Sequence, residues 1–289
     1  MVALVLISYS TEYVPIGSVK IRQTLGHIRH YVSNRSLLST DKRYNFNAAN
    51  RRASHKILCW LSTSEKTSKR RTAVEDTWGP RCDRTFYVTA SPADENLTAP
   101  VIINETTLQV PSVENYKQLK PKTYYALKFL MDYYLKEYDW FFKCDDDTYV
   151  VMENLRRFLA SYSPNDPHYF GCQQRVRGVL YNSGGAGYTL SRRSMSMLRD
   201  SVFPQLDPKN LPDPTEPEDI WMARLVDKIK ISSERTVDKD GRHRFLPLNP
   251  EHLINREIMP AAYRWFPNLS KYPVRDVGFS IVQGCKIIV

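Results

Sequence analysis

Three consecutive aspartates, Asp145, Asp146 and Asp147, are the residues whose spacing points most directly to chemistry. They follow the largely apolar segment 139–144, which has the pattern of a buried strand, so the carboxylates fall where a strand ends. Open α/β sheets bind ligands at that edge. Two carboxylates one residue apart can meet one hard divalent cation and leave its other positions to water and phosphate oxygens. A solvated acidic turn or a structural calcium loop is the alternative, but the flanking apolar strands favour a tightly held site.

A second acidic pair, Glu218 and Asp219, opens a predicted helix after a proline-rich loop. A carboxylate there can serve as a general base, although acidic residues also favour helix N-termini because of the helix macrodipole. The glycine-rich segment 183–187 lies between the two acidic clusters. Gly184 and Gly185 would let the backbone approach a ligand closely, because glycine has no Cβ. A tight turn is the alternative for this segment.

Strands that alternate with helices surround these clusters, and this order predicts an α/β domain with a mainly parallel sheet. Helical periodicity is clearest where apolar residues recur every three or four positions. The predicted strands are 57–61, 85–89, 101–103, 139–144 and 168–172, and the predicted helices are 64–78, 116–138, 153–162, 191–200 and the segment from Glu218.

The chain is basic, with a formal net charge of +10. Its lysines and arginines are spread along the sequence, and it contains neither a zinc-finger spacing nor an RNP-like segment, so the charge does not indicate nucleic-acid binding. A solvated basic surface, with a few arginines for a phosphorylated ligand, accounts for the composition.

The cysteines and glycosylation sequons favour an oxidising, lumenal compartment. The chain has five cysteines and no CxxC pair, which argues against a zinc site. Four Asn-x-Ser/Thr sequons begin at Asn34, Asn96, Asn104 and Asn268.

Eight segments in fixed order resemble glycosyltransferase family 31, the β1,3-glycosyltransferases. Together they are far more specific than any one of them, and they span about residues 57–260. The segments are ILCW at 57–60, RTAVEDTW at 71–78, KT at 122–123, DWFFK and DDDTYV within 139–150, YFG at 169–171, SGGAGY at 183–188, ED at 218–219 and PEHLI at 250–254.

The resemblance implies a GT-A type fold, in which a mixed, mainly parallel sheet is flanked by helices and binds a nucleotide-diphospho-sugar. It further implies Mn²⁺ as cofactor, UDP-galactose as donor, and GalNAc linked α to Ser or Thr of a glycoprotein as acceptor. The reaction would invert the anomeric carbon and give a β1,3 linkage. A Golgi membrane anchor with a lumenal catalytic domain is also implied.

Roles follow residue by residue from the resemblance. Asp145 and Asp147 would hold Mn²⁺ and the donor, with Asp146 beside them, and Asp219 would be the base that deprotonates the acceptor hydroxyl. Two sets of further contacts are expected: Arg71, Lys122, Gly184 and Gly185 with the nucleotide, and Tyr181, Glu218, His252 and Trp265 with the acceptor.

These further contacts have ordinary alternatives. Arg71 and Lys122 could equally face solvent, His252 could be a satisfied loop residue, and Trp265 could pack in the core. We therefore expect the acidic residues to be the firmest part of the site.

The sequence also departs from the family. The resemblance pairs Cys59 with Cys82, and leaves the state of Cys144, Cys172 and Cys285 open. The family's late metal-binding histidine has no counterpart, which predicts an atypical or truncated C-terminal end. Residues 1–54 are expected to be a stem or linker before a catalytic domain over 55–289. Their apolar run, Met1–Ile7, falls short of the ~20 residues of a membrane span, so we expect the anchor to be missing from the chain.

Three other functions stay open at this point. Transfer of another sugar, such as GlcNAc, would depend on pocket shape. A non-catalytic chaperone resembling the family is a second alternative, although such a relative lacks the aspartate triplet that this chain keeps. A nucleic-acid-binding module is the third, and would bind with a steep dependence on salt. The oligomeric state is also open, with a homodimer as one alternative.

Overall fold

The computed structural model describes residues 55–91, 97–115, 119–211, 216–238, 243–248 and 286–288. All of them belong to Ala53–Val289, the second of the two compact units into which the chain divides. The predicted stem, 1–54, lies outside the described residues.

Helices and strands alternate along the described chain, as the sequence predicts. In order they are β1 (Ile57–Ser62), η1 (Glu65–Thr67), α3 (Ser68–Asp76), η2 (Gly79–Arg81), β2 (Arg84–Ala90), β3 (Val101–Ile102), β4 (Thr107–Val110), α4 (Leu119–Tyr133), β5 (Trp140–Asp145), β6 (Thr148–Val150), α5 (Met152–Leu159), β7 (Tyr169–Gly171), β8 (Gln173–Val176), β9 (Val179–Asn182), η4 (Gly184–Ala186), β10 (Tyr188–Ser191), α6 (Arg192–Ser201), η5 (Phe203–Gln205), α7 (Glu218–Lys228) and β11 (Lys286–Ile288), where η marks a 3₁₀ helix.

A mixed sheet of seven strands forms the centre of the domain, in the order β3-β4-β2-β1-β5-β10-β7. The central strands β4, β2, β1 and β5 run parallel, whereas β3 and β10 run antiparallel to their neighbours. This arrangement confirms the predicted α/β fold of GT-A type. Strand β10 was not predicted from the sequence, although Tyr188, Thr189, Leu190 and Ser191 alternate between apolar and polar side chains. The run is only four residues long and directly follows the glycine-rich segment, so it gives a weak strand signal.

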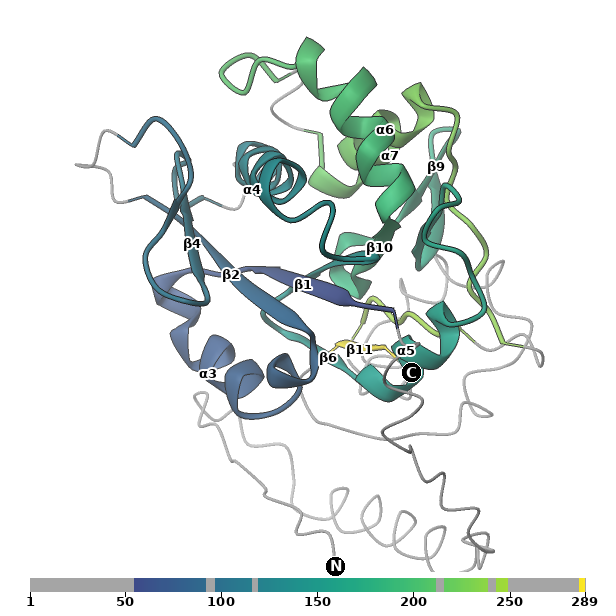
Figure 1. Ribbon diagram of the computed structural model, residues 1–289, viewed down its shortest axis with the longest axis horizontal. Helices are drawn as coiled ribbons and strands as arrows, with labels where there is room; N and C mark the ends of the chain where they lie inside the picture. The colour runs from purple at the N-terminus through teal and green to yellow at the C-terminus, as the bar shows by residue number, and fades with distance from the viewer. Residues whose placement is uncertain are drawn as a thin grey trace, which may run out of the picture. The chain divides into compact units, whose positions relative to one another are not determined.

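Helices cover both faces of the sheet (Figure 1): α4, α6 and α7 lie on one side, and α3 and α5 lie on the other. The two-residue period of β1 explains how one strand serves both layers. Leu58 and Trp60 belong to the core beneath α4, α6 and α7, whereas Ile57, Cys59 and Leu61 belong to the core with α3 and α5.

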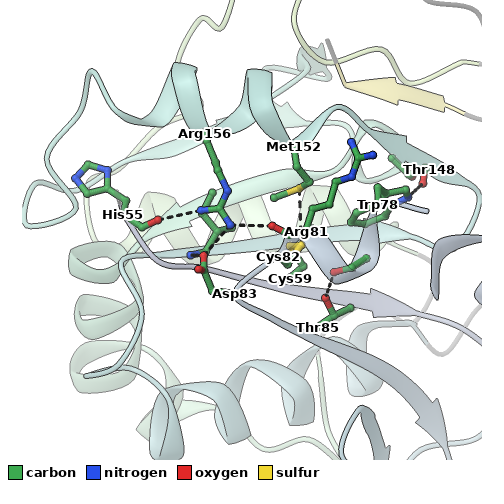
Figure 2. Close-up of a disulfide and its surroundings, with 12 residues drawn as sticks. His55, Cys59, Trp78, Arg81, Cys82, Asp83, Thr85, Thr148, Met152 and Arg156 are labelled. Atoms are coloured by element: carbon green, nitrogen blue, oxygen red, sulfur yellow. Dashed lines mark hydrogen bonds and ion pairs between the residues drawn. A yellow bond between two sulfur atoms is a disulfide. The ribbon is translucent and has the colours of Figure 1, made fainter. Parts of the chain in front are cut away.

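A disulfide joins Cys59 of β1 to Cys82, the pair that the family resemblance implies. Figure 2 shows Arg156 of α5 beside it, where its guanidinium donates to the carbonyl oxygens of His55 and Arg81 and to Asp83 Oδ2. The covalent link and this arginine together fix the start of β1 against α5. Cys144 and Cys172 are free and buried, and burial raises the pKa of both thiols.

Helix α4 ends at Tyr133, earlier than the sequence predicts. The chain turns after the helix, where Glu137 N donates to Tyr134 O at 3.1 Å. Asp139 then accepts hydrogen bonds from Lys56 N at 2.8 Å and from the Arg192 guanidinium at 2.9 Å at the entry to β5. Within the described ranges, no helix combines the length and the apolar character that crossing a bilayer requires.

Candidate active site

A pocket of about 630 Å³ opens where β1 and β5 end. Ser62 is in register with Asp145, so the carboxyl ends of these two strands lie side by side. The glycine loop before β10 and the start of α7 complete the wall. The lining residues are Ser62, Thr63, Ser64, Thr67, Arg70, Glu114, Asn115, Leu119, Lys120, Lys122, Lys143, Asp145, Asp146, Asp147, Gly184, Gly185, Glu216, Pro217, Glu218 and Asp219.

The three aspartates divide into one structural side chain and two that are more accessible. Asp146 is buried, and its Oδ2 accepts a hydrogen bond from Thr63 Oγ1 at 2.8 Å, which ties the turn to the end of β1. Asp145 and Asp147 are partly exposed on the pocket wall. Arg70 Nη1 lies 3.6 Å from Asp146 Oδ1 and 3.8 Å from Asp147 Oδ2, so one flexible cation faces the turn.

Asp145 and Asp147 place hard oxygen donors on one wall, and such donors suit Mg²⁺, Mn²⁺ or Ca²⁺. Among the residues that the structure describes, no three His, Cys, Asp or Glu side chains are grouped to hold a metal ion by themselves. The donor set therefore fits a cation whose coordination is completed by water and by oxygens of a ligand, as is usual where a cation is bound together with phosphates.

Lys143 is a buried cation at the base of the pocket, two residues before the aspartates. Its Nζ donates a hydrogen bond to Asp145 Oδ1 at 2.9 Å and lies 3.6 Å from Glu218 Oε2. Burial lowers the pKa of Lys143, but the charges of Asp145 and Glu218 outweigh it and the net shift is upward. The ammonium group therefore stays charged and links the aspartate turn to the start of α7.

Glu218 is directed into the interior. Its Oε1 accepts hydrogen bonds from Tyr188 Oη at 2.7 Å and from Thr123 Oγ1 at 3.0 Å. Burial raises the pKa of Glu218, while Lys143 and the bond from Tyr188 oppose the shift. These three protein groups already engage the carboxylate, so the predicted contact between Glu218 and the acceptor stays a prediction.

Asp219, the next residue of α7, presents a fixed carboxylate to the pocket. Its Oδ2 accepts from Gly184 N at 2.9 Å, and its Oδ1 accepts from Ile220 N at 2.9 Å. A Cβ added to Gly184 would lie 3.3 Å from the Asp219 Cβ and 3.4 Å from Glu218 Oε2. Glycine at this position therefore allows the loop to approach the two acids closely enough to orient Asp219.

Lys122 supports the opposite part of the wall. It is buried, and its Nζ donates to Thr63 O at 2.6 Å and to the two oxygens of Glu114 at 3.0 and 3.1 Å. Burial lowers the pKa of Lys122, and Glu114 opposes the shift. Lys122, Gly184 and Gly185 all line the pocket. Their predicted contacts with the nucleotide stay predictions.

Arg71 is not among the residues that line the pocket, and its predicted contact with the nucleotide stays a prediction. Its guanidinium donates to Glu75 at 2.8 Å and to Thr107 at 2.9 Å, and it lies 4.6 Å from the centroid of the Tyr87 ring. These contacts hold α3 against the sheet. The neighbouring Arg70 lines the pocket instead, with 55% of its side chain exposed. The sequence does not fix the rotation of α3 about its axis, and so it could not choose between adjacent arginines.

Of the remaining predicted residues, the structure describes Tyr181 but not His252 or Trp265. Tyr181 on β9 is not among the pocket-lining residues; its Oη donates to Gln174 Oε1 at 2.7 Å, and burial raises its pKa to about 12. His252 and Trp265 lie outside the described residues.

Sequence reasoning missed Lys143 as a member of the site. The available signal was a lysine inside an otherwise apolar strand, since a buried lysine is rare without an anionic partner. Other missed lining residues, such as Thr63 and Glu114, carry no comparable signal, because they come from loops that only the fold brings to the pocket.

Known proteins share much of this chain. Residues 53–238 match the family model described as Fringe-like. Glycoprotein-N-acetylgalactosamine 3-beta-galactosyltransferase 1 of Xenopus laevis is 29% identical over 223 residues, which is 76% of this chain and 58% of that protein. Chondroitin sulfate glucuronyltransferase of Homo sapiens is 28% identical over 151 residues, 45% of this chain and 19% of that protein. Human chondroitin sulfate synthase 3 is 33% identical over 64 residues, 22% and 7% respectively. The chain thus spans less than two thirds of each of these relatives.

Proposed function

Because the chain belongs to the Fringe-like family, and with it to glycosyltransferase family 31, we propose that it transfers galactose from UDP-galactose to GalNAc linked α to Ser or Thr. Family membership supports β1,3-glycosyl transfer as the reaction class, and the two sugars are the finer part of the proposal. One observation carries it: the partly exposed Asp145 and Asp147 and the oriented Asp219 line a single pocket. Similarity to the Xenopus galactosyltransferase over 76% of the chain supports this choice of sugars.

The donor side of the pocket would hold the diphosphate. Asp145 and Asp147 would bind Mn²⁺, and a bound divalent ion supplies neutralising charge for a diphosphate leaving group. Arg70 is free to turn from the aspartates towards a phosphate, because it is half exposed and its ion pairs are 3.6 and 3.8 Å long. Lys143 would keep Asp145 in place from below through its hydrogen bond.

The acceptor side would use Asp219 as general base. Its carboxylate takes the proton of the GalNAc 3-hydroxyl while that oxygen bonds to the anomeric carbon of galactose, and the bond from that carbon to the diphosphate breaks. A single displacement inverts the carbon, so an α-linked donor gives a β-linked product. The amides of Gly184 and Ile220 orient the carboxylate for this transfer.

The proposed location is the lumen of the secretory pathway, with the Golgi as the compartment of the reaction. The disulfide between Cys59 and Cys82 supports an oxidising compartment. Protease protection of the native protein in sealed Golgi vesicles measures this directly; digestion without detergent would contradict a lumenal position.

The test is a transfer assay with the purified chain, Mn²⁺ and a peptide that carries α-linked GalNAc. UDP-galactose should support transfer that EDTA abolishes. Asp219→Asn should lower kcat by about 10²–10⁴-fold, the usual contribution of a general base, and should leave UDP binding intact. Asp147→Asn should weaken Mn²⁺-promoted UDP binding, measured by calorimetry.

Asp200→Asn is the matched control, because Asp200 is an exposed residue of α6 whose hydrogen-bond partners among the described residues are Arg199 and Ser196. Its activity should equal that of the wild type. Full activity of Asp219→Asn would remove this residue from the base role.

Other donors are tested in the same assay. UDP-GlcNAc and UDP-glucuronic acid belong in the panel, the latter because two relatives are chondroitin enzymes. Transfer from either one, without transfer from UDP-galactose, would overturn the proposed donor but not the enzyme class. A folded protein that binds no UDP and transfers no sugar would instead be a non-catalytic relative.

A further inference from the structure

The turn between β3 and β4 presents Asn104 in the sequon Asn104-Glu105-Thr106. Asn104 is exposed, and its Oδ1 accepts hydrogen bonds from Thr106 N at 3.0 Å, Thr106 Oγ1 at 3.2 Å and Thr107 N at 2.8 Å. Within the described residues no hydrogen bond engages Nδ2. This is an Asx turn in which the amide oxygen is used and the amide nitrogen remains available.

The turn is anchored from its inner side. Arg84 Nη2 donates to Glu105 O at 2.6 Å, and Tyr87 N donates to Thr106 O at 2.7 Å. Both donors belong to β2, a strand inside the sheet. The backbone around Asn104 is therefore fixed to the sheet, and its exposed side chain stands on the outer side of the turn.

The strand before the turn is an exposed apolar edge. Among the described strands, β3 ends the sheet order and β4 is its one partner. Val101, Ile102 and the following Ile103 are 42%, 40% and 57% exposed. The segment 97–103, LTAPVII, contains no charged residue, so it lacks the charges with which edge strands commonly resist pairing with other chains.

We propose that Asn104 carries an N-linked oligosaccharide, and that this glycan covers the apolar edge formed by Val101, Ile102 and Ile103. The asparagine lies one residue beyond the edge, and an N-glycan is bulky and hydrophilic. A lumenal compartment suits the modification, and the disulfide between Cys59 and Cys82 forms under the same conditions. The proposal does not depend on which sugar the enzyme transfers.

The chemistry leaves the turn intact. A bond forms between Nδ2 and the first sugar carbon of a lipid-pyrophosphate-linked oligosaccharide, the bond from that carbon to the pyrophosphate breaks, and Nδ2 loses one proton. Oδ1 is retained. The three hydrogen bonds that Oδ1 accepts therefore persist in the glycosylated protein.

Occupancy is tested on the full chain directed into the secretory pathway of animal cells by an added signal peptide. Peptide-N-glycosidase treatment in heavy-oxygen water, followed by peptide mass spectrometry, should convert Asn104 to labelled aspartate in most molecules. Recovery of the Asn104 peptide without a glycan, while the chain folds and is secreted, would overturn the assignment.

The covering role has a separate test. Asn104→Asp removes the glycan but keeps a carboxylate oxygen that can accept the turn hydrogen bonds. We expect this variant to self-associate several-fold more than the wild type in sedimentation velocity, and Ile103→Thr added to it should restore wild-type behaviour. Peptide-N-glycosidase treatment of the folded wild type, which leaves aspartate at position 104, should reproduce the association of Asn104→Asp.

UDP affinity should be unchanged in these proteins, because Asn104 is not among the pocket-lining residues. A glycan-free protein that associates no more than the glycosylated one would overturn the covering role and leave occupancy standing.

Discussion

Neighbouring residues in this site have different tasks, because a helix or strand turns adjacent side chains to different surroundings. Asp219 lines the pocket with an oriented carboxylate, whereas Glu218 is held in the interior by Tyr188 and Thr123. Arg70 and Arg71 divide in the same way between pocket and scaffold. Two residues of one sequence motif can therefore have different roles, one in the pocket and one in the protein interior.

The two arginines give a matched pair of substitutions. Arg70→Met should lower UDP affinity about tenfold, or about 1.4 kcal/mol, because it removes a pocket cation, and should change stability by under about 0.5 kcal/mol. Arg71→Met should keep UDP affinity and lose about 1–2 kcal/mol of stability, since it loses hydrogen bonds to Glu75 and Thr107 and its place over Tyr87. Calorimetry and urea unfolding measure the two effects. If Arg71→Met lowered UDP affinity and Arg70→Met lowered stability, the orientation of α3 described above would be contradicted.

Tyr188→Phe tests how the interior supports the base. Glu218 would lose its 2.7 Å donor, and a hydrogen bond to a charged group contributes about 1.5–3 kcal/mol. We expect this loss of stability in urea unfolding, together with a lower kcat at unchanged UDP affinity, because Glu218 directly precedes Asp219. Tyr133→Phe is the control, since Tyr133 is 67% exposed on α4.

The effect of Tyr188→Phe should depend on pH. Burial raises the folded-state pKa of Glu218, and losing the Tyr188 bond, which opposes that shift, should raise this pKa further. A raised folded pKa means that stability falls as pH rises through the window above the usual glutamate value. The destabilisation should therefore grow from acidic to neutral pH. A constant difference across that range would show that Glu218 is not the group affected.

Short elements position the site, and the strand entry at Gly187 is closely packed. Gly187 has φ 77° and ψ 159°, a region almost confined to glycine. A Cβ there would lie 2.8 Å from Lys143 O and 2.9 Å from Phe142 Cζ. The absence of a side chain thus lets β10 begin directly against β5, beside the lysine that supports the aspartates.

Gly187→Ala should therefore destabilise the protein by about 2–5 kcal/mol, the sum of backbone strain and overpacking. Gly178→Ala separates the two terms, because Gly178 also has a positive φ of 84° but has no atom within 4 Å of an added Cβ. It should lose only about 1–2 kcal/mol. Urea unfolding of both variants gives the comparison, and equal losses would contradict the close packing of β10 on β5.

Across the whole described domain, the pocket exists because segments far apart in sequence end at one edge of the sheet. β1 and β5 bring Ser62 and Asp145 into register, and the antiparallel β10 delivers the glycine loop to the same edge. Helix α7 then presents Asp219 to Gly184 N, 35 positions away in the chain. Two cores, one on each face of the sheet, hold these strand ends in fixed positions.

The sequence by itself determined the α/β class, the family and the acidic clusters, because these depend on local periodicity and on short ordered motifs. Apolar runs at β1, β2 and β5 are long enough to identify a strand without any partner. The Asp triplet after β5 and the acids that open α7 follow from their places next to those elements.

Only the tertiary structure decided which side chains meet. The rotation of α3 places Arg70 rather than Arg71 at the pocket, and pairing with β5 and β7 identifies the four-residue strand β10. The link from Asp145 through Lys143 to Glu218 joins positions more than 70 apart in the chain. Side-chain contact across such a separation depends on strand register and helix rotation, and these are set by packing of the whole domain rather than by local sequence.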